Sequence, residues 1–131
     1  MMLKFNFLIL FVCTLFIGCD DERANMKELS AIATEVNAKC PQMLDSETRF
    51  DGIEVKEPNT LSYRYTLIKL LSQNVDTVQF YRMLWPGIVS NIRVSAEMKK
   101  LRENKTNIEY FYQDKNGKPI YTFRISPADY K

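Results

Sequence analysis

The sequence predicts a small α+β protein in which helices pack on one face of a four-stranded antiparallel sheet. Three observations lead to this fold class: two stretches with apolar residues at helical spacing, four stretches in which apolar and polar residues alternate, and turn residues between them. Their order is α-β-β-α-β-β. The 131 residues suffice for one domain with a core and are too few for two.

Residues 1–18 are expected to be a signal peptide. Lys4 follows the amino terminus, and residues 5–17 are apolar except for Asn6 and Thr14. This run is too short to cross a bilayer comfortably, because a membrane-spanning helix takes about 20 residues. It therefore fits the apolar segment of a secretory signal better than a membrane anchor.

The end of this run resembles the lipobox of bacterial lipoproteins. Ile17, Gly18 and Cys19 match the lipobox, and Phe16 replaces its usual leucine. The resemblance implies diacylglycerol on the Cys19 thiol, cleavage before Cys19 and a further acyl chain, such as palmitate, on the new amino group. Several chains suit stable anchoring, because each buried methylene contributes about 0.8 kcal/mol. The alternatives are an ordinary signal peptide with a chance cysteine and an uncleaved anchor.

The expected location is the periplasmic face of a membrane in the cell envelope. Asp20, directly after the cysteine, resembles the inner-membrane retention signal of enteric lipoproteins. The inner membrane is therefore slightly favoured, and the outer membrane is the alternative.

Residues 19–25 are interpreted as the lipidated cysteine and a charged tether, and residues 26–131 as the single α+β domain. The first helix is expected to begin after Asn25, an N-cap that forms a capping box with Glu28, and to end before Pro41. Its apolar stripe consists of Met26, Leu29, Ile32, Ala33, Val36 and Cys40.

The first hairpin follows a loop over residues 41–48. The pattern predicts a strand over 49–56 with a bulge at Gly52, a turn at 57–59, and a strand over 61–67 in which Leu and Tyr alternate with polar residues. Asp76 is expected to be the N-cap of the second helix, which Pro86 should kink or divide into two. Ser95 is the expected cap of a further short helix.

The last hairpin has alternating residues over 108–112 and 121–125. Asn116-Gly117 between them is typical of a type I′ turn, and Pro127 is expected to end the sheet. The chain thus divides into two α-β-β halves, 26–71 and 76–126. They share a pattern but few identities, so an internal duplication is an alternative only.

The amino-acid composition excludes several classes of function. The chain has no histidine, which excludes histidine-based zinc sites and Ser-His or Cys-His catalysis. Lys4 is the only one of 18 Lys and Arg in the expected signal peptide, which leaves 17 basic against 16 acidic residues. A nearly neutral domain gives no electrostatic case for nucleic acid. No cofactor motif or metal-binding motif is present, so none is expected.

Cys40 is expected to be the only thiol left in the mature protein. Cys13 would leave with the signal peptide, and Cys19 would carry lipid. An intramolecular disulfide is then impossible. The position of Cys40 on the apolar stripe favours a small core residue over a reactive thiol or an intermolecular disulfide.

The polar stretch 37–51 is the most distinctive part of the sequence. Together with a Tyr-x-Tyr-Thr strand and the hairpin 114–117, it resembles small bacterial membrane-associated and secreted proteins of unknown function. The residues that carry this resemblance are Asn37, Pro41, Asp45, Thr48, Arg49, Asp51, Tyr63, Tyr65 and Thr66.

Asp45, Arg49 and Asp51 are candidate binding residues within this stretch. Two acids around a loop most often cap turns, and Arg49 is a natural ion-pair partner. This structural role is favoured over a ligand or ion site, and over catalysis by the two carboxylates.

The chain is rich in tyrosine, and five of the seven tyrosines fall in the predicted strands. Core and cross-strand packing is the favoured interpretation. The alternative is a sheet face left open for a partner, because tyrosine and arginine often anchor interfaces. Arg64, Phe111 and Arg124 lie on the opposite side of the predicted strands and form a second candidate binding surface.

These observations favour a membrane-anchored, non-enzymatic lipoprotein that binds another envelope protein. Assembly factors, pilotins, immunity proteins and exclusion lipoproteins have this size and anchoring. A small-ligand-binding envelope protein is the first alternative. The second is an enzyme that uses Asp45 and Asp51, or Cys40.

Overall fold

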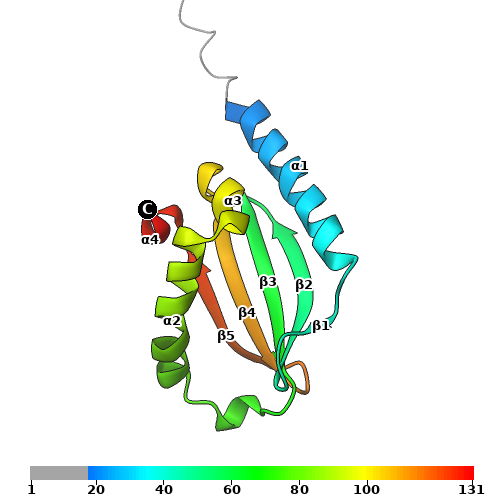
Figure 1. Cartoon of the computed structure of the whole chain (residues 1–131), viewed down its shortest axis with the longest axis vertical. Helices are drawn as coiled ribbons and strands as arrows, with labels where there is room; N and C mark the ends of the chain where they lie inside the picture. The colour runs from blue at the N-terminus through cyan, green and yellow to red at the C-terminus, as the bar shows by residue number, and fades with distance from the viewer. Residues whose placement is uncertain (1–17) are drawn as a thin grey trace, which may run out of the picture.

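The computed structural model describes residues 18–131, with side chains from Asp21 onward (Figure 1). The expected signal peptide up to Ile17 lies outside the described residues. Within the described part, no helix is both long enough and apolar enough to cross a membrane. The elements are α1 (Gly18–Asn37), β1 (Gln42–Met43), β2 (Thr48–Lys56), β3 (Thr60–Leu67), η1 (Ser72–Asn74), α2 (Thr77–Val94), η2 (Ala96–Met98), α3 (Lys99–Glu103), β4 (Asn107–Asp114), β5 (Pro119–Ile125) and α4 (Pro127–Tyr130).

The fold is α+β, but its sheet differs from the prediction of four antiparallel strands. It is a five-stranded mixed sheet in the order β1-β2-β3-β4-β5, and its central pair, β3 and β4, is parallel. The physical reason is the crossover between these strands. Helix α2 runs back along the sheet, so β4 starts from the same end as β3, as in a βαβ unit.

The fifth strand comes from the region predicted to be a loop. In β1, Gln42 pairs with Phe50 and Met43 with Arg49 of β2. A strand of two residues carries no readable alternation, so the sequence pattern could not reveal it. Its shortness also protects the edge of the sheet from pairing with other chains.

The helices cover one face of the sheet. Helix α1 packs on β2 and α2 packs on β5, with β3 and β4 between them (Figure 1). In the first half of the chain the helix covers the first strand of its hairpin, and in the second half it covers the second strand. The two halves therefore differ in packing as well as in sequence. The fully buried core side chains on this face include Leu29, Leu61, Ile92, Ile108, Phe123 and Ile125.

Helix α1 is longer at its start and shorter at its end than expected. It begins at Gly18, so the predicted N-cap Asn25 lies inside the helix, and residues 19–25, which were expected to form a tether, are helical. It ends at Asn37, three residues before Cys40. The side chain of Asn37 explains this end, because it leaves the helix to bind the backbone of β2.

Helix α2 begins as predicted. The Asp76 carboxylate accepts hydrogen bonds from the backbone N–H groups of Val78 and Gln79, at 3.0 and 3.1 Å. Pro86 lies inside one unbroken helix, so the alternative of two separate helices is wrong. The C-terminal end of α2 is stabilised by Arg102, whose guanidinium donates hydrogen bonds to the carbonyls of Ile92 and Ser95, both at 2.7 Å.

The last hairpin has a different turn from the predicted type I′. A type I′ turn requires positive φ at both central residues. Gly117 has φ +81°, but Asn116 does not have a positive φ. The buried Asp114 side chain sets this turn. It accepts hydrogen bonds from the N–H groups of Asn116 and Lys118, both at 2.9 Å. Beyond β5, Ser126 and Asp129 form a capping box at α4, a helix that the pattern did not predict.

Candidate functional site

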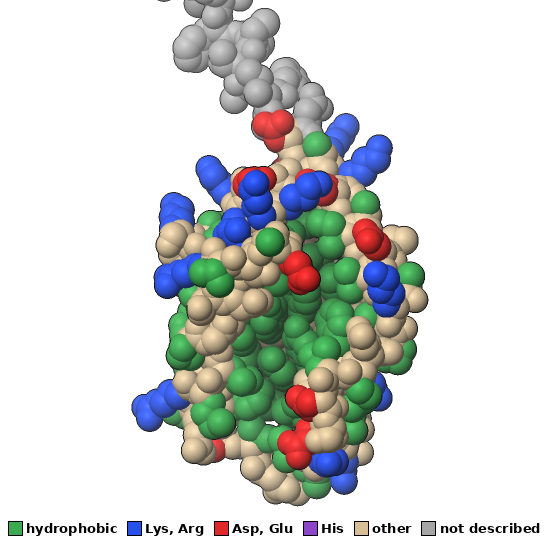
Figure 2. Space-filling view, viewed as in Figure 1, with side chains coloured by type: hydrophobic (Ala, Val, Ile, Leu, Met, Phe, Trp, Pro, Cys, Tyr) green, Lys and Arg blue, Asp and Glu red, His purple; other side chains and the backbone are tan. Residues whose placement is uncertain are grey.

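A groove lies on the helix-covered side of the sheet, between α1 and α2. Figure 2 shows a hollow lined by hydrophobic side chains there, over the middle strands of Figure 1. We call it the central groove. Its floor consists of Phe50 from β2, Tyr63 and Tyr65 from β3, and Tyr110 and Tyr112 from β4.

The aromatic rings of the floor form one continuous surface. Phe50 pairs with Tyr65 across β2 and β3, and Tyr65 pairs with Tyr112 across β3 and β4. The ring centroids lie 5.3 Å apart in the first pair and 4.9 Å apart in the second. These rings are only half-buried, although they face the same side as the core. The register of three strands therefore builds a wide apolar surface that the chain does not cover.

The floor carries hydroxyl groups but no charge. Burial raises the pKa of Tyr65 far above its usual value, and it raises the pKa of Tyr112 to about 12. Both phenols therefore stay neutral at physiological pH and keep their O–H donors. The Tyr63 hydroxyl lies 3.7 Å from the sulfur of Met98. The groove is thus apolar with a few fixed hydrogen-bonding groups.

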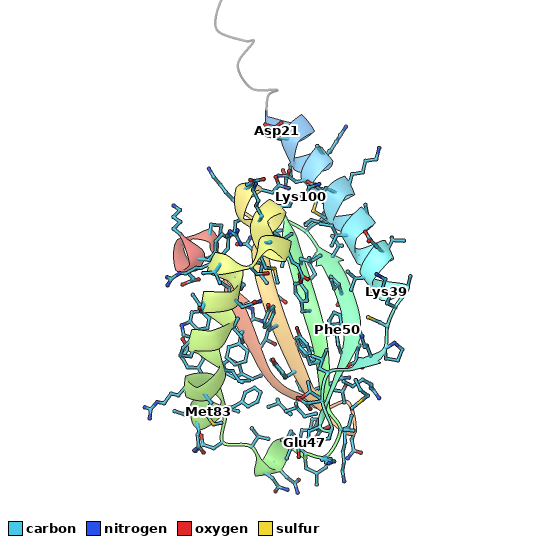
Figure 3. All side chains as sticks on the ribbon, viewed as in Figure 1. Asp21, Lys39, Glu47, Phe50, Met83 and Lys100 are labelled. Carbon is cyan, nitrogen blue, oxygen red and sulfur yellow. The ribbon has the colours of Figure 1, made fainter. Side chains whose placement is uncertain are left out.

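One end of the groove is closed by a contact between α1 and the α3 segment. The Glu28 carboxylate accepts hydrogen bonds from Lys100 Nζ at 2.6 Å and from Asn104 Nδ2 at 2.7 Å. The bond from Lys100 is the main cause that lowers the pKa of Glu28, and it raises the pKa of Lys100 in turn. Figure 3 places Lys100 between α3 and the upper part of α1.

Exposed apolar side chains lie toward the other end of the molecule. Met83 of α2 is 72% exposed, and Leu44, next to β1, is 56% exposed. Met43 and Leu70 are also exposed. Figure 3 shows Met83 and Glu47 at the end of the molecule away from Asp21. Exposed apolar residues beside a half-buried aromatic floor are typical of a surface that binds a partner.

The predicted pair of acids, Asp45 and Asp51, is not brought together by hydrogen bonds or by a shared cation. Asp45 accepts the backbone N–H groups of Glu47 and Thr48, at 2.7 and 2.8 Å, and these bonds lower its pKa. Asp51 binds Arg49 Nε at 2.6 Å and the Thr66 hydroxyl at 2.5 Å, on the opposite side of the sheet from the groove. Each carboxylate is therefore occupied by a local contact.

The rest of the distinctive polar stretch also has a structural role. The Asn37 side chain accepts from the N–H of Ile53 at 2.7 Å and donates to its carbonyl at 2.9 Å. The β-bulge next to Ile53 requires Gly52, whose φ is +140° and whose added Cβ would lie 2.6 Å from Asn37 Oδ1. Asn37 and Gly52 together dock the end of α1 onto β2. These contacts explain the spacing of the motif by folding rather than by chemistry.

Arg64, Phe111 and Arg124 lie on the opposite face of the sheet. The Arg64 guanidinium sits 4.3 Å from the centroid of the Phe111 ring and 3.0 Å from Glu54 Oε2. Arg124 is farther from its partner, with Nε 3.9 Å from Glu109 Oε1. Lys56 also contacts Glu109, at 3.0 Å. Cations and carboxylates therefore alternate on this face and neutralise one another.

Cys40 follows α1 and is half-buried rather than part of the fully buried core. Its thiol lies 3.4 Å from the carbonyl oxygen of Val36. Burial, and the nearby negative charge of Asp51, raise the pKa of the Cys40 thiol, which disfavours the reactive thiolate. Among the described residues, no group of three or more Cys, Asp or Glu side chains is arranged to hold a metal ion.

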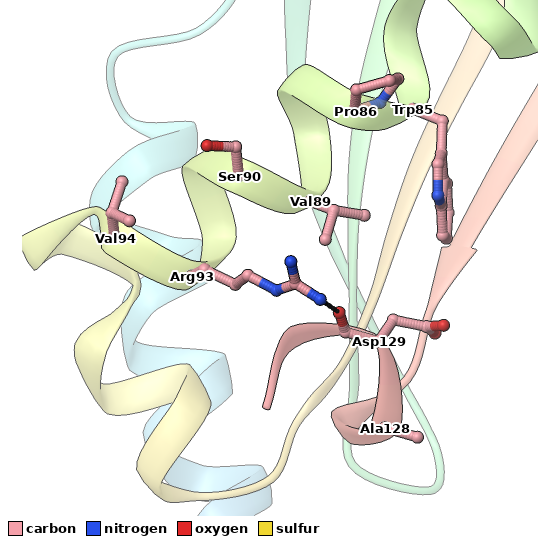
Figure 4. A pocket seen from close by; sticks show the side chains of 8 residues that line it. All are labelled: Trp85, Pro86, Val89, Ser90, Arg93, Val94, Ala128 and Asp129. Atoms are coloured by element: carbon pink, nitrogen blue, oxygen red, sulfur yellow. Dashed lines mark hydrogen bonds between the residues drawn. The ribbon is translucent and has the colours of Figure 1, made fainter.

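A second hollow lies between α2 and α4 (Figure 4). It is shallow, with a volume of about 520 Å³. The Arg93 guanidinium donates to the carbonyl of Asp129 at 2.8 Å and so ties α4 to α2. None of the residues predicted as a site lines this hollow. Its lining consists of Trp85, Pro86, Val89, Ser90, Arg93, Val94, Ala128 and Asp129.

The fold and the groove define a class: small α+β proteins with helices on one side of a mixed sheet and an aromatic groove between them. The chain belongs to the family described as Domain of unknown function (DUF8479), whose model matches residues 23–121. No curated protein matches the chain in sequence.

Three solved structures share the fold. A Pseudomonas aeruginosa protein described as secreted has a TM-score of 0.67 and 16% identity, over 85% of this chain and 96% of its own. The pilotin EpsS of the Vibrio vulnificus type 2 secretion system has a TM-score of 0.68 and 14% identity, over 86% and 97%. The type II secretion system pilotin AspS of Vibrio cholerae has a TM-score of 0.63 and 9% identity, over 85% and 96%. At these identities the likeness establishes the fold.

Proposed function

We propose that this protein is a lipid-anchored, non-enzymatic binding module of the bacterial envelope, and that its central groove binds a helical segment of another envelope protein. The observation that carries this proposal is the uncovered aromatic floor. Phe50, Tyr65 and Tyr112 are half-buried on the core side of the sheet, where a compact domain would cover them. A bound helix would complete the helical layer between α1 and α2.

The composition of the floor favours a protein partner over a small ligand. Tyrosine offers a large apolar surface together with a hydroxyl donor, and it is enriched at protein interfaces. The groove is open toward solvent on the side seen in Figure 2, whereas small-molecule sites bury most of their ligand.

The groove is a better candidate than the opposite face. On that face, Arg64 is paired with Glu54, and Lys56 is paired with Glu109. A partner that bound there would have to replace contacts that the protein already makes. In the groove it would cover apolar rings that have no cover, which gives a net gain of buried area.

The structural neighbours support one of the expected roles. Two of them are named as pilotins of type 2 secretion systems, and the third is described as secreted. Pilotins were among the roles that the size and the lipobox favour, so this role moves ahead of the immunity and exclusion roles. The preference for the inner membrane has only Asp20 behind it, and the neighbours do not support it.

Several observations favour a non-enzymatic role. Asp45 and Asp51 are each held by local hydrogen bonds, and the pKa of the Cys40 thiol is raised. An enzyme that used these groups would need them free, close together and facing a cleft.

The groove is tested by site-specific photo-crosslinking in native membranes. Benzoylphenylalanine replaces Tyr65 in the full chain, and the matched control carries it at Thr122, on the opposite face of β5. We expect one envelope protein to crosslink at position 65 at least tenfold more strongly than at position 122. Equal yields, or no adduct at position 65, would reject the groove as the binding site.

The anchor is tested separately by labelling growing cells with an alkyne analogue of palmitate. The wild-type protein should take up the label and remain with membranes, whereas Cys19→Ala should lose both properties. An unlabelled wild-type protein would show that the match to the lipobox is coincidental. The crosslinking result would still stand in that case, because it depends on the folded domain.

A further inference from the structure

Helix α2 carries two rows of residues with the same spacing. One row faces the sheet, and the other lies one residue earlier and faces the central groove. The sheet row consists of Tyr81, Trp85, Ile88 and Ile92. The groove row consists of Phe80, Leu84, Gly87 and Asn91.

Contacts with the floor fix the direction of the groove row. The Phe80 ring lies 5.2 Å from the Tyr112 ring, measured between centroids. Leu84, one turn further along the helix, is half-buried. Helical spacing then places Gly87 and Asn91 on the same side.

The spacing of the groove row is that of a helix-packing seam. Its residues follow one another at intervals of four, three and four, which is the repeat of positions that face a neighbouring helix. The sheet row has the same intervals, and in it Ile88 and Ile92 are buried whereas Tyr81 and Trp85 are half-buried. The groove row has no helix against it in the described part of the chain, and Gly87 and Asn91 are exposed.

Neither a close contact nor the backbone conformation requires glycine at position 87. A Cβ added at this position would meet no atom within 4 Å, and its φ lies outside the left-handed region. Glycine is also one of the worst residues for the interior of a helix, and here it follows Pro86. Where two helices pack together, a glycine at the contact allows the backbone of the second helix to come close, because glycine has no side chain.

We propose that Gly87 is the point at which the partner helix crosses α2 at close range. This inference rests on the proposed function, because it names the contact that the groove makes. The crossing helix would place a small residue against Gly87 and apolar residues against Phe80 and the tyrosine floor.

The facing side of α1 fixes the polarity of the partner helix. Glu28 faces α3, and helical spacing places Ile32 and Glu35 on the same side of α1. Glu35 is exposed. The partner is therefore an amphipathic helix, apolar toward α2 and the sheet and charged toward α1, with a base opposite Glu35.

The test adds Gly87→Leu to the protein that carries benzoylphenylalanine at position 65. The matched control is Ser90→Leu, an equally exposed position of α2 that lines the hollow beside α4. Gly87→Leu should lower the yield of the crosslinked adduct at least tenfold, and Ser90→Leu should leave it within twofold of the parent. Gly87→Ala should lower the yield less than Gly87→Leu.

Thermal unfolding separates blocked binding from damaged folding. Both Gly87 variants should melt at or above the temperature of the parent protein, because the added side chain enters open space and both residues favour helix more than glycine does. An undiminished adduct in Gly87→Leu would overturn the close crossing and leave the proposed function standing. Absence of an adduct in the parent would instead overturn the proposed function.

Discussion

The two faces of the sheet differ in how completely their side chains are satisfied. On the face away from the helices, charges lie in pairs: Arg49 with Asp51, Arg64 with Glu54 and Lys56 with Glu109. On the helix-covered face, the rings of Tyr65 and Tyr112 pack against each other and have no complete cover. The charged groups of the first face are paired within the chain, whereas the rings of the second face lack a complete cover.

This difference shows that exposure alone is a poor guide to function. The charged face has the more conspicuous residues, but its charged groups already have partners. The groove has few charges and a half-buried surface, but covering it would bury apolar area that the fold leaves open. Binding is expected where the fold leaves interactions unmade.

The largest contrast is expected between a phenylalanine of each face. Phe123 is 1% exposed and contacts five aromatic rings, whereas Phe111 is half-buried beneath Arg64. Phe123→Ala should lower the free energy of unfolding by about 3–5 kcal/mol, and Phe111→Ala by about 1 kcal/mol. Urea unfolding measures both values. Equal losses would mean that the opposite face carries a core of its own.

The groove face should also dominate the loss of stability at alkaline pH. Burial raises the pKa of Tyr112 from 10.0 in the unfolded chain to about 12, and it raises the pKa of Tyr110 in the same direction. A raised folded pKa means that the stabilisation is complete below pH 10 and is lost as the pH rises through about 12. Tyrosine absorbance near 295 nm, followed with circular dichroism, should show these residues ionising together with unfolding. Reversible ionisation near pH 10 with the fold intact would mean that the floor is solvated.

The sequence pattern predicted most of the local structure. Alternation and turn residues placed both hairpins within one or two residues, and the Asp76 cap placed the start of α2. The pattern could not show that β3 and β4 are parallel, because pairing between distant strands depends on where a crossover helix returns. A two-residue strand such as β1 is too short for any periodicity.

The candidate site was harder to predict than the fold. The tyrosines of the strands were visible, and an open tyrosine face was one alternative, but core packing was favoured over it. Whether a ring is covered depends on the spacing of α1 and α2 over the sheet, which no local pattern encodes. By contrast, Asn37 and Gly52 stood out as polar and turn residues, and a contact across 16 positions of the chain turned out to explain them.

A smaller effect is expected from the closed end of the groove. Lys100 and Asn104 lower the pKa of Glu28 below 4.5, so the bond stabilises the folded state above that pH and is lost as the pH falls further. Glu28→Gln should weaken the acid dependence of unfolding between pH 5 and 3 (about the range in which carboxylates titrate). It should also raise the crosslinking yield at position 65 if the contact restricts entry to the groove. Thermal melts at several pH values and salt concentrations provide the check. If both proteins lost the same stability as the pH falls from 5 to 3, the Glu28 contact would have no such role.

The smallest effect is expected from the ion pairs of the opposite face. Arg64 and Glu54 are 35% and 52% exposed, so solvent and salt screen their attraction and the pair contributes at most about 1 kcal/mol. Arg64→Ala should therefore change the free energy of unfolding by less than about 1 kcal/mol and leave the crosslinking yield at position 65 unchanged. The same substitution also removes the cation from the Phe111 ring. A large loss of binding in this variant, with stability intact, would transfer the binding role to the opposite face and reverse the comparison between the two faces.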